Sequence, residues 1–147
     1  MQNTPLLTAD EIRKGTEKGL EKYNNQNFLT RYALFMGMCQ ILEFGLKKLL
    51  EERYNYNNEK IKKWTLGRTT STLKDEGLRP DFIQLLEQLV GQRNDIAHEM
   101  LANSALMNSL FESYEFSNKD ERTLAKATYC LENIIFLFDW TNQNEAW

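Results

Sequence analysis

The sequence predicts an all-helical fold, in which one domain forms an up-down bundle of four to five helices. Its 147 residues suit a single core, and 41% of them are hydrophobic, as in ordinary globular proteins. Only seven Gly and two Pro interrupt the chain, whereas a β-sandwich of this length needs many more turn residues. Long apolar-periodic segments joined by short polar connections are typical of such a bundle. We therefore treat residues 1–147 as one domain.

Two helices are predicted in the first part of the chain. Thr8, with Glu11 three residues later, matches the capping box that begins a helix, and this helix runs to about Tyr23. It is mostly polar, so we expect it to lie on the bundle rather than inside it. The second helix spans about residues 27–54. Between residues 32 and 46 (YALFMGMCQILEFGL) it is apolar almost all round, which predicts a helix covered by neighbours on several sides.

The remaining helices follow a basic linker. The segment NYNNEKIKKWTLGRTT, residues 55–70, is predicted to be this linker, and it leads into a short helical turn around residues 71–74. A third long helix spans about residues 80–103, because the proline at its start suits a first helical turn. Residues 104–116 either extend that helix or form a packed loop. A last helix runs from about residue 117 to about residue 140.

The charge balance limits the classes of partner. The formal net charge is −3, whereas broad, sequence-independent binding of nucleic acid normally requires a basic protein. A small local site for one phosphate group remains compatible with this charge. We therefore look for such a site in single motifs rather than in the overall composition.

Metal and cofactor sites are not expected. The chain has one His and two Cys, and both Cys39 and Cys130 lie in apolar runs, which predicts buried free thiols. The segment TLGRTTST lacks the Gly and Lys spacing of a phosphate-binding loop. The sequence thus predicts a protein without metal or cofactor.

A membrane location is not expected either. No apolar run reaches the roughly 18 residues that a spanning helix needs. The first residues, MQNTPLLTADEIRKG, lack the basic start and apolar stretch of a signal peptide. We expect a cytoplasmic protein that does not contact a membrane.

The third long helix places an arginine on its apolar face. When successive residues are placed about 100° apart around the helix axis, the apolar side chains form one stripe that faces the core. Arg93 lies near the centre of this stripe. Asn94 and His98 fall one helical turn apart on the flank of this stripe. The apolar members of the stripe are Phe82, Leu85, Leu86, Leu89, Ile96, Ala97 and Met100.

A guanidinium group at such a position is costly unless something pairs with it, and three solutions are open. A carboxylate from a neighbouring helix, with Glu43 as the candidate, could hold Arg93. The aliphatic stem could lie along the core while the charged head reaches solvent. Alternatively, the helix face borders a cleft that admits an anion such as a phosphate, which Arg binds in bidentate fashion.

The combination of Arg93, Asn94 and His98 is specific. The chance that the single His follows one of seven Arg at this spacing, with Asn directly after the Arg, is about 1%. Arg93-Asn94-Asp95-Ile96-Ala97-His98 resembles the R-x4–6-H signature of the HEPN superfamily (higher eukaryotes and prokaryotes nucleotide-binding domains), in which a polar residue commonly follows the Arg. The preceding TLG turn and the helix FIQLLEQLVGQRNDIAHEM also resemble this family. The resemblance covers about residues 28–140.

The resemblance implies a HEPN-like bundle that forms a homodimer, with the two motif helices facing each other across a cleft. For active members it implies metal-independent cleavage of RNA by a toxin or effector of prokaryotic defence or toxin–antitoxin systems. It also implies a possible antitoxin or regulatory partner. Other members are non-catalytic nucleotide- or protein-binding modules, and such a module is the alternative function for this chain.

The chain departs from one branch of the family. In the branch that is paired with nucleotidyltransferase antitoxins, a Tyr stands two residues after the His, whereas this chain has Met100 at that position.

The residues suit this chemistry. Cleavage by the 2′-hydroxyl of RNA needs a base, an acid and positive charge on the phosphorane. Because the chain has one His, a His acid and a His base together require two chains. We expect Arg93, Asn94 and His98 to be the catalytic set. The substrate-binding candidates, which would hold flanking phosphates, are Lys60, Lys62, Lys63 and Arg68.

Overall fold

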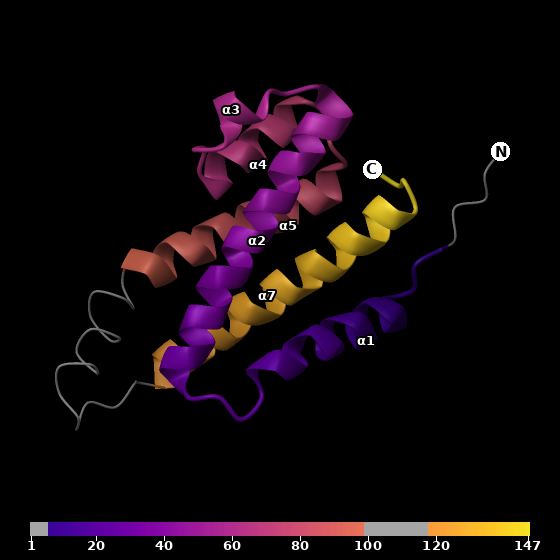
Figure 1. The fold of residues 1–147 in the computed structure, drawn as a ribbon. Coiled ribbons are helices and arrows are strands. Elements are labelled where there is room, and N and C mark those ends of the chain that lie inside the picture. The colour runs from indigo at the N-terminus through magenta and orange to yellow at the C-terminus, as the bar shows by residue number, and fades with distance from the viewer. Residues whose placement is uncertain (1–5, 99–117) are drawn as a thin grey trace.

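The computed structural model describes residues 6–98 and 118–147, and this part of the chain contains helices and no strand, which confirms the predicted all-helical class. None of the described helices combines the length and low polarity that a membrane span requires. The elements are α1 (Ala9–Leu20), η1 (Glu21–Tyr23), α2 (Phe28–Tyr54), α3 (Asn58–Ile61), α4 (Leu66–Asp75), α5 (Pro80–Asp95) and α7 (Asn118–Gln143). The four long helices α1, α2, α5 and α7 alternate in direction along the bundle, and the start of α1 and the end of α7 lie at the same end of the molecule (Figure 1).

The first two helices begin where the sequence predicts. The Glu11 N–H donates to Thr8 Oγ1 at 3.1 Å, and the Thr8 N–H donates to Glu11 Oε2 at 3.1 Å, so the capping box forms. Asn27 caps α2, because its side-chain oxygen accepts from the Thr30 N–H at 2.8 Å. The helix ends at Asn55, whose left-handed φ of 58° terminates the α conformation.

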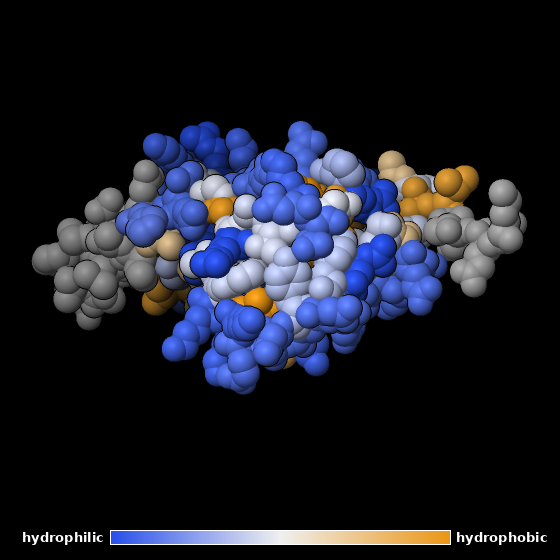
Figure 2. Space-filling model, turned by 90° about the horizontal axis from the view of Figure 1, so that it is seen from above, coloured by the Kyte–Doolittle hydropathy of each residue, from blue (hydrophilic) through white to orange (hydrophobic). Residues whose placement is uncertain are grey.

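The predicted linker is wrong in one respect, because it contains helical structure. Asn57 caps the short α3, and Thr65 caps α4, which begins five residues earlier than the predicted turn at residues 71–74. Leu66 is buried, so the start of α4 is anchored in the core. Seen from above, over α3 and α4, the surface is mostly hydrophilic (Figure 2).

The third predicted helix starts at Pro80, as expected, and α5 is followed by a π-helical turn over residues 96–98. The prediction that it ends near residue 103, and the two alternatives for residues 104–116, lie outside the described residues. The last helix, α7, extends to Gln143, three residues beyond the predicted end.

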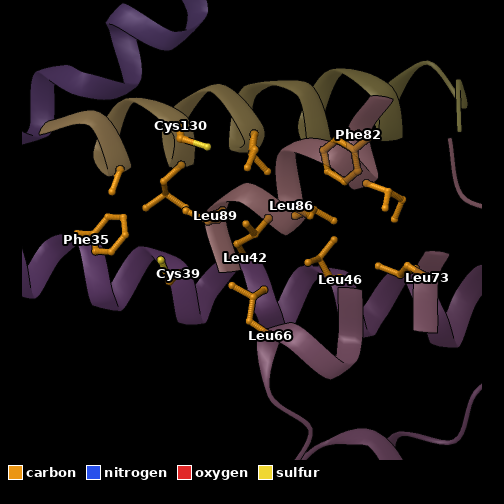
Figure 3. Packing of buried hydrophobic residues seen from close by; sticks show 14 of the residues in the cluster. Phe35, Cys39, Leu42, Leu46, Leu66, Leu73, Phe82, Leu86, Leu89 and Cys130 are labelled. Atoms are coloured by element: carbon orange, nitrogen blue, oxygen red, sulfur yellow. The ribbon is translucent and has the colours of Figure 1, made fainter. Parts of the chain in front are cut away.

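The core forms between α2, α4, α5 and α7, where α2 and α5 each pack on both α4 and α7. Leu46, Leu86, Leu89, Leu131 and Ile134 are each fully buried. Side chains from α2, α4, α5 and α7 point toward one another in this region (Figure 3). Truncating one such leucine to alanine typically costs about 2–5 kcal/mol, so this layer dominates the stability.

The prediction that α2 is covered on several sides is only partly correct. Its residues Tyr32, Phe35, Cys39 and Leu42 are buried on one side, but Ile41 and Phe44 on the opposite side are both 61% exposed. Apolar residues on a helix usually indicate contact, but the contact need not come from the same chain. The described helices therefore bury one face of α2 and leave the other uncovered.

Helix α1 packs closely against α7 because it presents two glycines. A Cβ atom added at Gly15 would lie 2.1 Å from Cδ2 of Phe136, and one added at Gly19 would lie 2.8 Å from Oε2 of Glu132. The two glycines are four residues apart, as are the two α7 side chains that cover them. One face of α1 is thus flat enough to receive two large α7 side chains.

The carboxylate of Glu132 is buried between these helices and is paired. Glu132 is 2% exposed, and its Oε1 accepts hydrogen bonds from Lys22 Nζ and, at 3.2 Å, from Tyr23 Oη. A buried carboxylate is tolerated only with such partners. Burial raises the pKa of Tyr23, and the neighbouring Glu132 raises it further, so the phenol remains a donor.

We predict that Gly15→Ala lowers the free energy of unfolding by about 1–3 kcal/mol, because the new methyl group forces the Phe136 ring away from α1. The matched control is Gly91→Ala on α5, where an added Cβ meets nothing within 4 Å. That variant gains up to about 1 kcal/mol from helix propensity. Urea unfolding of both variants measures the difference, and equal stabilisation of both would contradict the close α1–α7 contact.

Candidate functional site

Arg93 lies in the last turn of α5 and faces the N-terminal half of α2. Its side chain is half-buried and close enough to Tyr32 and Cys39 for its charge to act on both. Burial raises the pKa of Cys39 to about 12, and the Arg93 guanidinium opposes part of that rise. Burial likewise raises the pKa of Tyr32, again with Arg93 acting in the opposite direction. The positive charge is therefore felt in the α2–α5 contact.

The expected pairing of Arg93 with Glu43 is absent. Glu43 Oε2 lies 3.8 Å from Lys47 Nζ, and this is its ion pair. The hydrogen bond of the Arg93 side chain goes to its neighbour, with Nη1 3.5 Å from Asn94 Oδ1, at the long limit for such a bond. Within the described part of the chain, no carboxylate neutralises Arg93. Apart from this bond, the guanidinium of the half-buried Arg93 therefore keeps donors that an anion can use.

Asn94 and His98 are both exposed, as expected for the flank of the apolar stripe. The burial of the other stripe residues agrees with the predicted core-facing side of the helix. The buried members are Phe82, Leu86, Leu89 and Ile96, and Leu85 is half-buried. Met100 lies outside the described residues. His98 belongs to the π-helical turn that follows α5. Such turns change the angular spacing of side chains and often occur at functional sites. The motif thus presents one half-buried cation and two accessible polar side chains.

The four basic residues predicted to hold flanking phosphates are all exposed, namely Lys60, Lys62, Lys63 and Arg68. Lys62 Nζ is engaged with Glu59 Oε2 at 2.7 Å, and Arg68 lies over the Trp64 ring at 4.5 Å. Of these four residues, Arg68 lies on α4, which packs directly on α5, the helix that carries Arg93. A Cβ added at Gly67 would lie 3.4 Å from Val90 Cγ1, one helical turn before Arg93.

Lys47 is a residue that the sequence reasoning missed. It pairs with Glu43, and its Nζ also donates to the backbone oxygen of Lys62 at 2.8 Å, so it joins α2 to the end of α3. The signal was present, because Glu43 and Lys47 have the i, i+4 spacing of a helical ion pair. That spacing gives Glu43 a local partner and weakens its assignment to Arg93.

Other reactive groups do not gather near the motif in the described residues. No group of three or more His, Cys, Asp or Glu side chains able to hold a metal ion occurs there. Cys39 and Cys130 are free and buried, and burial raises the pKa of Cys130 to about 11. Both thiols are therefore protonated and unreactive at neutral pH.

Comparisons with family models, with curated proteins and with solved structures gave no match to this chain. The functional assignment therefore depends on the geometry around Arg93.

We predict that Arg93→Met changes the free energy of unfolding by less than about 1 kcal/mol, because Arg93 forms no ion pair with the described residues and the substitution extends the apolar stripe. As a contrast, Lys22→Met costs about 3 kcal/mol, because it leaves the Glu132 carboxylate buried without its counter-charge. Thermal or denaturant unfolding measures both. A loss in Arg93→Met as large as that in Lys22→Met would mean that Arg93 has a structural role.

Proposed function

We propose that the protein is a HEPN-like, metal-independent endoribonuclease whose active site forms in the cleft of a homodimer. The observation that carries this proposal is the half-buried side chain of Arg93, which has no carboxylate partner among the described residues and lies beside Asn94 and five residues before His98, both accessible polar side chains. A bound anion supplies the partner that the guanidinium lacks.

Each residue has a chemical role in this proposal. Arg93 binds the scissile phosphate and stabilises the charge that develops on the phosphorane. His98 of one chain removes the proton of the 2′-hydroxyl, and His98 of the other chain protonates the leaving 5′-oxygen. The 2′-oxygen attacks phosphorus while the bond to the 5′-oxygen breaks, so the products are a 2′,3′-cyclic phosphate and a 5′-hydroxyl. Asn94 orients the phosphate or the imidazole by hydrogen bonding.

The surrounding charges suit a short substrate contact. Arg68 is carried on the helix beside α5, and Lys60 and Lys63 are exposed on the segment that follows the C-terminal end of α2. Because the net charge of the chain is −3, affinity for RNA comes from these few cations rather than from the whole surface. The protein then acts in the cytoplasm as an effector or toxin in a prokaryotic defence or toxin–antitoxin system, under the control of an antitoxin or regulatory protein.

The alternative is a non-catalytic, HEPN-like nucleotide- or protein-binding module. The observation that favours it is the uncovered apolar face of α2, since exposed apolar side chains such as Ile41 and Phe44 are typical of protein contacts. In this alternative Arg93 binds a phosphate group without cleaving it.

We predict that wild-type protein cleaves a mixed RNA pool in the presence of EDTA and leaves 2′,3′-cyclic phosphate ends. His98→Ala and Arg93→Ala each lower the rate by at least about 100-fold, because each removes a group that acts in the transition state. Arg122→Ala, an exposed arginine on α7, is the matched control and retains full activity. Absence of cleavage by well-folded, dimeric wild type would favour the binding module.

A mixing experiment tests whether two His98 side chains share one site. When His98→Ala protein is mixed with an equal amount of wild type and the chains exchange, about one quarter of the dimers carry two His98 side chains. Cleavage at fixed total protein then falls to about one quarter of the wild-type rate. A fall only to one half would mean that each chain acts alone.

A further inference from the structure

Helix α4 lies against α5 (Figure 1), and an open groove runs along their contact. It consists of two hollows with volumes of about 200 Å³ and about 360 Å³, which share Lys74 and Glu87. We call the two hollows together the α4–α5 groove. The smaller hollow is also lined by Gly67, Thr70, Ser71 and Val90, and the larger one has an apolar wall of Leu78, Pro80 and Ile83.

The α4–α5 groove leads toward the candidate functional site. On α5, Glu87 and Val90 line the smaller hollow, and Asn94 follows Val90 after about one turn on the same side of the helix. His98 comes next, on the π-helical turn that follows α5. The smaller hollow is therefore the end of the groove that lies nearer to Asn94 and His98.

The smaller hollow contains a hydroxyl group that lacks a partner in the described part of the chain. Thr69 Oγ1, the hydroxyl before it on α4, donates to the backbone oxygen of Thr65 at 2.8 Å. Thr70 is 2% exposed, and its Oγ1 has no such partner. Ser71, the next residue on the same wall of the groove, is exposed. A buried hydroxyl without a partner costs free energy, which a ligand with its own hydroxyl group recovers.

An ion pair crosses the middle of the α4–α5 groove. Lys74 Nζ lies 2.8 Å from Glu87 Oε1, and the two side chains are 62% and 48% exposed. Ion pairs as exposed as this one contribute little to stability, so the pair opens readily when another anion competes for the cation. The ammonium group also has three donors, of which this carboxylate uses one. Lys74 is therefore placed to bind a phosphate group in the groove.

The shape of the α4–α5 groove favours a single strand of nucleic acid. The axes of two packed helices lie about 8–10 Å apart, so the groove between them admits one strand and excludes a double helix. The apolar wall of the larger hollow gives the flat face of an unstacked base a surface on which to pack. Gln84, exposed beside this wall, carries an amide that suits the edge of a base.

Hydroxyl groups, an ammonium group and an apolar wall are complementary to the ribose, the phosphate and the base of a nucleotide. We propose that the α4–α5 groove binds a single-stranded RNA segment that extends from the scissile phosphate. Thr70 and Ser71 bind a ribose 2′-hydroxyl, which DNA lacks, and Lys74 binds a phosphate group. The inference rests on the proposed function for its ligand, and it adds the substrate class, single-stranded RNA, and three substrate-binding residues.

Binding of labelled strands to the His98→Ala protein tests this assignment, because that protein keeps the groove and does not cut the strand. Fluorescence anisotropy compares an RNA strand of about 12 nucleotides with DNA of the same sequence and with the RNA duplex. We expect the RNA strand to bind at least about 5-fold more tightly than either of the others, because only the strand fits the groove and only RNA carries the 2′-hydroxyl.

Substitutions in the same protein separate the contacts. Thr70→Val removes the hydroxyl and keeps the shape of the side chain, so the affinity for RNA falls about 5-fold and the affinity for DNA is unchanged. Lys74→Gln weakens the binding of both strands and reduces the slope of log K against log salt concentration by about 0.7, as the loss of one phosphate contact requires. Glu87→Gln tightens the binding of both strands, because it removes the carboxylate that competes for Lys74.

The matched controls are Lys18→Gln and Glu17→Gln, which change the same charges at exposed positions on α1, a helix that packs on α7. They alter neither affinity by more than about 1.5-fold, because charges far apart on the surface are screened by salt. Equal binding of RNA and DNA, no binding of RNA, or Thr70→Val and Lys74→Gln variants that bind as the parent does, each overturns the assignment of the groove.

Cleavage by wild type in EDTA is measured separately, so the two proposals fail independently. If the groove variants change binding as expected and wild type does not cleave RNA, the nuclease is wrong and the RNA-binding groove stands. If wild type cleaves RNA and the groove variants bind as the parent does, the nuclease stands and the strand follows another path.

Discussion

Burial of one side of α2 against α4 and α7 is the contact on which the other features of the molecule depend. The fully buried Leu46, Leu73 and Leu131 come one from each of these three helices. Because a single helix face is used in this contact, the described helices leave the opposite face of α2 uncovered. Since α5 also packs on α4 and α7, its last turn comes close to the N-terminal half of α2. The position of Arg93 and the exposure of Phe44 are thus two consequences of one packing arrangement.

The carboxylate of Glu132 and the guanidinium of Arg93 differ in their surroundings. Glu132 is enclosed, and its carboxylate receives Lys22 and Tyr23 from the α1–η1 segment, so that charge belongs to the fold. Arg93 is half-buried, and the nearby carboxylate of Glu43 lies with Lys47 instead. No carboxylate among the described residues pairs with Arg93, and burial of a cation without a partner costs free energy, which is the basis of the proposed anion binding. Asn94 and His98 are exposed beside Arg93 and on the following π-helical turn, respectively.

Much of the fold could be predicted from local signals. Thr8 with Glu11, Asn27 and Pro80 mark helix starts through caps and first-turn preferences, which act within four residues and do not depend on packing. The apolar stripe of α5 follows from helical periodicity. The helical content of residues 55–70 was missed because a short, charged segment has no apolar period. Asn57 and Thr65 are the caps that could have revealed it.

The sequence by itself determined the all-helical class and the presence of Arg93 on the apolar side of its helix with Asn94 and His98 beside it. These properties depend on periodicity and capping, which are local. Only the tertiary structure decided that Glu43 pairs with Lys47, that Gly15 and Gly19 bring α1 against α7, and that one face of α2 is uncovered. Each of these depends on how helices far apart in the sequence approach one another. A helical wheel gives the direction of a side chain but not the neighbour that it meets.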